Sequence, residues 1–538
     1  MEKGPVCARK KEDDNMKLID IIAEKEQLVF TLDEPFTGTL TLTEEAPIIH
    51  GEQVIRAKET LQFTDGKAAA ARHAGEHDRI FGRFLLTAAG APVPGVCYVT
   101  GFGESCDTVN DPYPQPDTIK TLNTCHEIAA PLGAKQTRPD VNLPMVIALH
   151  EHPDTIPYRF EGRTYYIFKS ALATIERTIA GFELSSLIVL NSPRVFGCQP
   201  DQEDLLQVCI HPHYQDKDPS AFISAFNMTS VEGQQVFAAF ISFLAMRYAC
   251  QQGKYGTVGG IVISNEINLQ YNWSNAGETP VEDYMEEYTQ AMRIAWLAAA
   301  GQYRNFRIYS SLANNWNMTH ENPLLLYHGR ECIDLLGSNS VRDGNFPWHV
   351  AFHPYPESFD HPDFWNDRAA EFQLDTPRIT YRNMEVLEAY LAQPQLLYKG
   401  QPRRIIFSEQ GFNSGDGPLR ELHEKWAAAG YVLSYMKARN MKTVDMMTHH
   451  STIDNPHEFG LNLGVYRYDA NAPFNKGEAK PIAWAIQLMD TPAEVLAIQF
   501  AREVIGDTLF DYILNPPAIA AGRDGSLDTE FGSGKDNA

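Results

Sequence analysis

The N-terminal part of the chain alternates between apolar and polar residues with a period of two. Residues 28–32 and 39–43 follow this pattern and are rich in threonine, which is typical of half-buried antiparallel strands. Gly, Pro and Asp interrupt the pattern about every 8 to 12 residues as far as residue 99, a spacing that predicts a small β-sandwich. We place this module at residues 16–105, after a charged and patternless leader at residues 1–15.

A different pattern follows a loop rich in Pro and Asp at residues 107–117. Short apolar runs, each expected to form a strand, occur at 119–123, 134–144, 186–193, 259–266, 306–314, 349–355, 403–409 and 443–450. Apolar residues at helical spacing lie between them at 171–180, 233–248, 281–299, 381–391 and 419–439. Strands that alternate with helices in this way predict an α/β fold, a (β/α)8 TIM barrel at residues 118–490. One more helix (493–504) and a disordered tail should complete the C-terminal segment, 491–538.

Composition narrows the possible ligands and the cellular location. The chain has 538 residues and a net charge of −24, which argues against nucleic acid because its binding depends on basic residues. The eight cysteines form no CxxC pair, so neither a zinc knuckle nor a redox motif is expected. The chain lacks an apolar signal region and any apolar run of about 18 residues. We therefore expect no membrane partner and a cytoplasmic protein, or a secreted one if a signal was removed; the oligomeric state is left open.

Two of the apolar runs end abruptly in a carboxylate. Residues 259–263 lead into Ser264-Asn265-Glu266, and residues 404–407 lead into Ser408-Glu409. In the predicted barrel these are the ends of strands four and seven, on the face where barrel enzymes have their active sites. The long inserts at 151–169 and 194–227 should form loops on the same face. Two carboxylates at strand ends on one face indicate acid/base chemistry.

This arrangement resembles the clan A (β/α)8-barrel glycoside hydrolases, in which Asn-Glu ends strand four and a second Glu ends strand seven. The resemblance implies a retaining glycosidase that cleaves a β-linked oligosaccharide or glycoside by double displacement, without a cofactor or metal. Glu266 would be the acid/base and Glu409 the nucleophile. Surface carboxylates at the two strand ends are the structural alternative.

The resemblance also suggests substrate-binding residues. Asn265 would bind the sugar 2-hydroxyl, Tyr355 would donate to the nucleophile, and His353 would line the sugar site. Further candidates for stacking or for reading hydroxyl groups are Trp273, Asn314, Trp316, Asn142 and His450. Relatives carry an arginine near the end of strand two, where this chain offers Arg138, directly before Pro139. Each Trp could equally cover the barrel, and each His could be a packed imidazole.

Two other classes of function compete with this interpretation. His150-Glu151-His152 has the HxH spacing that metal-dependent barrel hydrolases use on an early strand. Such a site expects further Lys or His ligands at strands four and five, where this chain has Glu266 and Asn314. The third class is a barrel that binds glycans without hydrolysis, whose expected signature is the loss of one catalytic glutamate.

Overall fold

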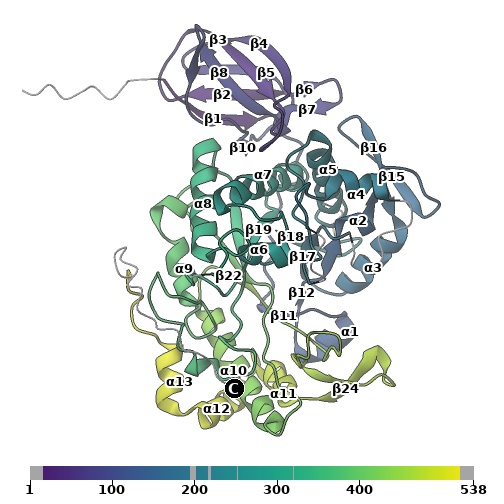
Figure 1. Cartoon of the computed structure of the whole chain (residues 1–538), viewed down its shortest axis with the longest axis vertical. Coiled ribbons are helices and arrows are strands. Elements are labelled where there is room, and N and C mark those ends of the chain that lie inside the picture. Colours follow the sequence, from purple (N-terminus) through teal and green to yellow (C-terminus); the bar gives the residue numbers. More distant parts are fainter. Residues whose placement is uncertain (1–15, 194–201, 216–219, 251–252, 319, 522–538) are drawn as a thin grey trace, which may run out of the picture.

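The structure is a computed structural model that describes residues 16–193, 202–215, 220–250, 253–318 and 320–521. The predicted leader and most of the predicted tail lie outside the described residues, as does part of the insert after strand three. Two regions fill Figure 1: a β-sheet module, purple, and a larger barrel surrounded by helices. Among the helices of the described ranges, none has the length and apolar character that a membrane span requires.

The N-terminal module consists of two four-stranded sheets. The first has the order β10 (Gly101–Phe102), β1 (Leu18–Ala23), β2 (Gln27–Leu32), β5 (Lys67–Ala71), and the second has the order β4 (Ile55–Phe63), β3 (Gly38–Glu45), β8 (Arg83–Ala88), β9 (Ala91–Val93). Alternate residues of β2 (Leu28, Phe30, Leu32) are buried, as the period-two pattern predicts. Phe30 meets Phe84 of the other sheet edge-to-face at 5.5 Å, so the sheets pack as a sandwich. β1 and β10 are a parallel exception to the antiparallel pairing.

The barrel is a closed ring of parallel strands, which confirms the predicted (β/α)8 fold. In chain order the strands are β11 (Lys120–Leu122), β12 (Gln136–Thr137) with β13 (Asp140–Asn142), β17 (Leu184–Leu190), β18 (Val258–Ile263), β19 (Arg307–Ala313), β20 (Trp348–His353), β21 (Ile405–Phe407) and β22 (Val444–His449). Pairing of β11 with β22, and of β12 with both β11 and β17, closes the ring. Glu266 and Glu409 therefore follow the fourth and seventh strands.

Strand two is interrupted, so the continuous strand predicted at 134–144 is wrong. Arg138 and Pro139 separate β12 from β13, and Leu143 already begins the short helix α2 (Leu143–Val146). Proline has no backbone N–H to donate to a central ladder. The Pro139 carbonyl still accepts a hydrogen bond from Ile188 N at 3.0 Å, which keeps the interrupted strand beside β17.

Helices form the outer layer of the barrel (Figure 1). The main ones are α3 (Lys169–Ile179), α5 (Val231–Tyr248), α7 (Val281–Ala300), α8 (Gly329–Asp343), α9 (Glu385–Leu391) and α10 (Arg420–Asn440). The insert after strand two forms the antiparallel sheet β14 (Ile147–Ala148), β16 (Arg163–Phe168), β15 (Thr155–Phe160), and the described part of the next insert contains α4 (Glu203–Cys209).

The C-terminal segment differs from the prediction of one helix after residue 490. Two helices follow, α12 (Glu494–Ile505) and α13 (Asp507–Leu514), after α11 (Pro481–Leu488) and the hairpin β23 (Tyr466–Tyr468), β24 (Lys476–Ala479). Lys437 of α10 donates from Nζ to the Ile513 carbonyl at 2.8 Å. The last helices therefore pack on the barrel's outer layer.

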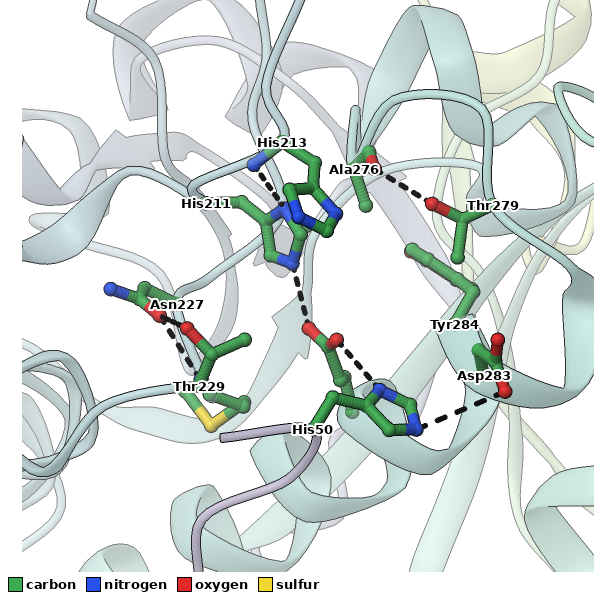
Figure 2. Close-up of polar contacts among 12 residues, drawn as sticks. His50, His211, His213, Asn227, Thr229, Ala276, Thr279, Asp283 and Tyr284 are labelled. Atoms are coloured by element: carbon green, nitrogen blue, oxygen red, sulfur yellow. Dashed lines mark hydrogen bonds and ion pairs between the residues drawn. The ribbon is translucent and has the colours of Figure 1, made fainter. Parts of the chain in front are cut away.

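Two histidine–carboxylate clusters attach the N-terminal module to the barrel. His77, in the small hairpin β6 (His73–Ala74), β7 (His77–Asp78), lies 2.5 Å (Nδ1 to Oε2) from Glu161 at the turn between β15 and β16. His50 Nδ1 lies 3.1 Å from Glu287 Oε1 on α7, and Glu287 Oε2 lies 2.8 Å from His211 Nε2. Figure 2 shows the His50 ring linked to Asp283 and to the carboxylate that also contacts the His211 ring. These contacts fix the module against the side of the barrel.

Candidate active site

The tip of strand four has an unusual backbone that presents Glu266. After β18 the chain passes through Ser264 and Glu266 with φ angles of 61° and 37°, a left-handed conformation that costs a non-glycine residue about 1–3 kcal/mol. Hydrogen bonds from Ser264 N to the Val189 carbonyl (3.0 Å) and from Glu266 N to Ser311 Oγ (2.9 Å) hold this turn. Both neighbouring strands thus fix the direction of the Glu266 side chain.

His353 connects the tips of strands four and seven. Its Nδ1 lies 2.8 Å from Glu266 Oε1, and its Nε2 lies 3.0 Å from Ser408 Oγ. The imidazole is fully buried, while the Glu266 side chain keeps 12% of its surface exposed. The carboxylate therefore reaches solvent on one side and has a fixed imidazole on the other.

Glu409 is held by two donors from different strands. The Tyr355 hydroxyl donates to Oε1 and the Arg138 Nη2 to Oε2, both at 3.1 Å. Arg138 also donates from Nε to the Ser408 carbonyl at 2.8 Å and pairs with Asp140. The break in strand two is what lets this buried guanidinium lie across the barrel end against the tip of strand seven. The arginine position implied by the family likeness is thus occupied by Arg138.

The electrostatic surroundings keep Glu409 ionised. Burial alone would raise its pKa, but His450, His353, Arg138 and the Tyr355 hydroxyl outweigh burial and lower the pKa to about 2. The pKa of His450 is raised in turn, because Glu409 and Glu458 outweigh the effect of burial. Burial, then Glu409, then Glu266 raise the pKa of Tyr355. A carboxylate with these neighbours is a base or nucleophile rather than an acid.

Asn265 carries an unused acceptor. Its Oδ1 is buried and has no hydrogen-bond partner among the described residues. A buried acceptor without a partner costs about 1–3 kcal/mol, and such groups occur where a ligand supplies the missing donor. This is compatible with the role that the resemblance implies for Asn265.

Asn314 and Asn142, also predicted to bind substrate, form hydrogen bonds within the protein instead. Asn314 donates from Nδ2 to the Tyr355 carbonyl at 3.0 Å and accepts from Arg378. Asn142 exchanges two hydrogen bonds with the backbone of Ser192, at 2.8 and 2.9 Å, and so joins the ends of strands two and three. Their amide groups are therefore committed to positioning neighbouring strand ends.

The two tryptophans differ. Trp316 is fully buried, donates from Nε1 to the Leu374 carbonyl at 2.9 Å and packs edge-to-face on Tyr390. The prediction that it stacks on a sugar is wrong, because its ring covers the barrel core. Trp273, at the end of α6 (Gln270–Trp273), is half-buried and lies 5.8 Å from the Phe222 ring. It stays a candidate for stacking.

The HxH pair lies outside the barrel. His150 and His152 follow β14, which pairs with β16 in the separate antiparallel sheet. His150 is largely exposed and its Nε2 contacts Asp204 at 2.6 Å, while the His152 ring packs near Phe168. The placement of these histidines on an early barrel strand is therefore wrong. Within the described ranges, no group of three or more His, Cys, Asp or Glu side chains is arranged to hold a metal ion.

Comparison with known proteins identifies the family. Residues 112–512 match a family of unknown function, DUF5722. The chain belongs to this family. The matched residues include every barrel strand and both glutamates, whereas the N-terminal sandwich lies before them. Among curated protein sequences, none matches the DUF5722 chain.

Solved structures of glycosidases resemble the DUF5722 chain at low identity. A family 39 glycoside hydrolase from the gut symbiont Bacteroides cellulosilyticus WH2 is 12% identical, with 90% of this chain and 83% of that chain covered and a TM-score of 0.42. The β-glycosidase of Thermosphaera aggregans is 14% identical, with coverage of 69% and 86% and a TM-score of 0.42. The β-glucosidase of Thermotoga maritima is 12% identical, with coverage of 69% and 85% and a TM-score of 0.40. Such distant likenesses carry no argument about activity, which rests on the geometry of the site.

Three residues near the glutamates were given no role from the sequence. Ser408 bonds His353, Ser311 holds the Glu266 backbone, and Glu458 lies 2.5 Å (Oε1) from His450 Nε2. Ser408 directly precedes Glu409, so a polar residue beside a strand-end carboxylate was a usable signal. The other two lie on a neighbouring strand and a distant loop and leave no local signature.

Proposed function

We propose that the protein is a retaining glycoside hydrolase, with Glu409 as nucleophile and Glu266 as acid/base. The observation that carries the proposal is the unequal surroundings of the two carboxylates at the ends of strands four and seven. Glu409 accepts from an arginine and a tyrosine and has a pKa of about 2, whereas Glu266 faces one imidazole. Glycoside cleavage by double displacement requires this inequality, because one carboxylate must stay ionised while the other exchanges a proton.

In the first step Glu409 attacks the anomeric carbon and Glu266 protonates the departing oxygen. In the second step Glu266 takes a proton from water, which then displaces Glu409 from the sugar. Tyr355 and Arg138 bind one carboxylate oxygen each, so they orient the nucleophile while it carries the negative charge.

His353 can serve both protonation states of Glu266. Nδ1–H donates to Glu266 Oε1, and Nε2 accepts from the Ser408 hydroxyl. The proton that Glu266 gives and takes can sit on Oε2, and Oε1 remains an acceptor whether the carboxyl group is ionised or protonated, so both contacts survive the change. The triad thus keeps the acid/base oriented through both steps.

The test removes Glu266 and supplies a nucleophile that needs no base. With a 2,4-dinitrophenyl glycoside, Glu266→Ala should form the glycosyl-enzyme and then stall, because the activated leaving group needs little protonation. Azide should accelerate turnover and appear in the product as a glycosyl azide of retained configuration. A methyl glycoside should gain nothing, since its first step still lacks an acid.

The control is Glu278→Gln, an exposed glutamate in the loop after strand four, which should behave as wild type with and without azide. Absence of azide rescue, or wild-type activity of Glu266→Ala on methyl glycosides, would exclude Glu266 as the acid/base. Proton NMR of the first product should show the substrate's anomeric configuration, and inversion would contradict the double displacement.

A further inference from the structure

A cavity of about 540 Å³ lies at the amino ends of the barrel strands, opposite the two glutamates. Arg307 begins β19, His349 lies near the start of β20, and Arg404 directly precedes β21. Ile22 of β1 and Phe102 of β10 line the other side, so the N-terminal module covers the cavity. In barrel enzymes this face serves stability rather than chemistry, and the proposed reaction gives the cavity no role.

The cavity is basic in a strongly acidic protein. Its lining contains Arg304, Arg307, Lys399 and Arg404, and among the described residues that line it none is Asp or Glu. Behind the lining, Asp445 pairs with both Arg307 and Arg404. Four cations thus face one carboxylate, although acidic residues outnumber basic ones by 69 to 45 in the whole chain. Uncompensated positive charge in a partly enclosed site attracts an anion.

Donors are available in the cavity wall. Arg304 donates from Nη2 to the Gly103 carbonyl at 2.7 Å and to Thr108 Oγ1 at 3.3 Å, but its Nε is buried without a partner among the described residues. His349 Nδ1 accepts from Arg404 N at 3.1 Å, which assigns the ring proton to Nε2. Burial and the neighbouring arginines hold the pKa of His349 well below its usual value, so the ring is a neutral donor.

The remaining walls are aromatic. Trp296 and Phe102 meet edge-to-face at 5.8 Å, and Tyr113 lies under the Arg307 guanidinium at 3.4 Å from the ring centroid. A cavity of this size, with apolar walls and a few convergent polar groups, suits a small molecule with an apolar body.

We propose that this cavity is a second, non-catalytic binding site for a phosphate monoester with a ring-sized apolar body. The phosphate lies among Arg304, Lys399 and the paired arginines, because arginine forks match phosphate oxygens and several cations favour a dianion over a monocarboxylate. The body of the ligand packs between the module and the barrel, so binding joins the two regions. The site is independent of the proposed hydrolase activity.

The experiment titrates the full-length protein with phenyl phosphate by isothermal calorimetry. Saturable binding of one equivalent is expected, with equal affinity in wild type and Glu409→Gln, because the site is remote from the nucleophile. Inorganic phosphate and benzoate should bind at least about tenfold more weakly, since one lacks the ring and the other carries a single charge. Phenyl phosphate should also raise the temperature of unfolding, because it binds the folded state.

Variants locate the site. Arg304→Gln should weaken phenyl phosphate binding about tenfold, and Lys399→Gln, an exposed position that leaves the packing intact, about threefold. Lys442→Gln is the matched control, because this exposed lysine is next to a lining residue but is not itself part of the lining; its affinity should equal that of wild type. Circular dichroism checks that the variants fold. The proposal is overturned if wild type does not saturate, if benzoate binds more tightly than phenyl phosphate, or if Lys399→Gln and a folded Arg304→Gln both match Lys442→Gln.

Discussion

The two ends of the barrel use positive charge in opposite ways. At the carboxyl end, Arg138, His353 and His450 surround Glu409, and each also contacts another protein group. At the amino end, Arg307 and Arg404 share Asp445, while Arg304 keeps an unused donor. The cations of the first end therefore fix the ionisation of one carboxylate. Those of the second end exceed their internal partners and leave positive charge for an external anion.

The function of a charge cluster depends on whether its charges are paired within the protein. A cluster whose charges are mutually satisfied shifts the pKa of its own members and prepares them for chemistry. A cluster with surplus charge leaves an electrostatic potential that acts on whatever binds. The same barrel thus separates a reactive end from a binding end, and substitutions at each end should have different consequences.

The largest effect is expected from the carboxylate at the reactive end. Glu409→Gln keeps the shape of the side chain but cannot form the glycosyl ester, so kcat should fall by at least about a thousandfold on aryl glycosides. The temperature of unfolding should fall, because Arg138 and His450 lose the ionised carboxylate between them. The variant should still bind phenyl phosphate. Retained turnover would exclude Glu409 as the nucleophile.

Removal of a cation from the reactive end comes next. Arg138→Gln should raise the pKa of Glu409, which is held near 2 partly by this guanidinium. Glu409 must be ionised to attack. On acidification the variant should therefore lose activity at a higher pH than wild type, so the acid limb of the kcat/KM profile should shift to higher pH. At neutral pH we expect a loss of about a hundredfold, corresponding to one charge-assisted contact.

Arg138→Lys is the companion variant. A lysine keeps the charge but cannot bind Glu409 and the Ser408 carbonyl with a planar fork. Its acid limb should stay near that of wild type while kcat still falls. If both variants keep the wild-type acid limb, Arg138 does not control the ionisation of Glu409.

Sequence reasoning recovered the barrel and the positions of both glutamates because these depend on short-range patterns. Buried parallel strands appear as apolar runs, and Glu266 and Glu409 end two of them. The alternation of β2 predicted the sandwich in the same way. α8 was not predicted, since the apolar part of its buried face is short (Cys332, Ile333, Leu336) and the face continues with Asn339 and Ser340.

The contacts that define the site depend on pairings across the barrel. A residue before a proline gives no sign of where its side chain lies, and only the structure shows the Arg138 guanidinium beside Glu409. Trp316 was misjudged because a tryptophan that covers a core and one that stacks on a sugar look alike in sequence. His150 and His152 had a metal-site spacing, but β14 leaves the barrel before them.

The third prediction removes the acid from the binding end. Asp445→Asn should lower the free energy of unfolding by about 2 kcal/mol, because two guanidiniums lose their shared counter-charge. The same substitution should increase the affinity for phenyl phosphate, since more positive charge becomes available. Denaturant unfolding and calorimetry measure the two quantities. Glu76→Gln, at an exposed pair with Arg159, is the control and should change neither. A gain in stability, or weaker binding of phenyl phosphate, would contradict a surplus of positive charge at the amino end of the barrel.

The smallest effect concerns a contact that fixes the N-terminal module against the side of the barrel. Burial lowers the pKa of His77, but Glu161 and Glu44 outweigh it and raise the pKa to about 9, from an ordinary value of 6.5. A raised pKa in the folded state means that the protonated histidine stabilises the attachment fully below about pH 6.5, and that this stability is lost as the pH rises through about 9. At about pH 6, His77→Gln should therefore lower the free energy of unfolding by on the order of 1 kcal/mol, measured as a lower midpoint of denaturant unfolding. At about pH 10 it should differ little from wild type. His73→Gln, exposed in the same hairpin, should match wild type at both values. A gap between His77→Gln and wild type that stays constant with pH would show that packing, rather than the charge on His77, fastens the module.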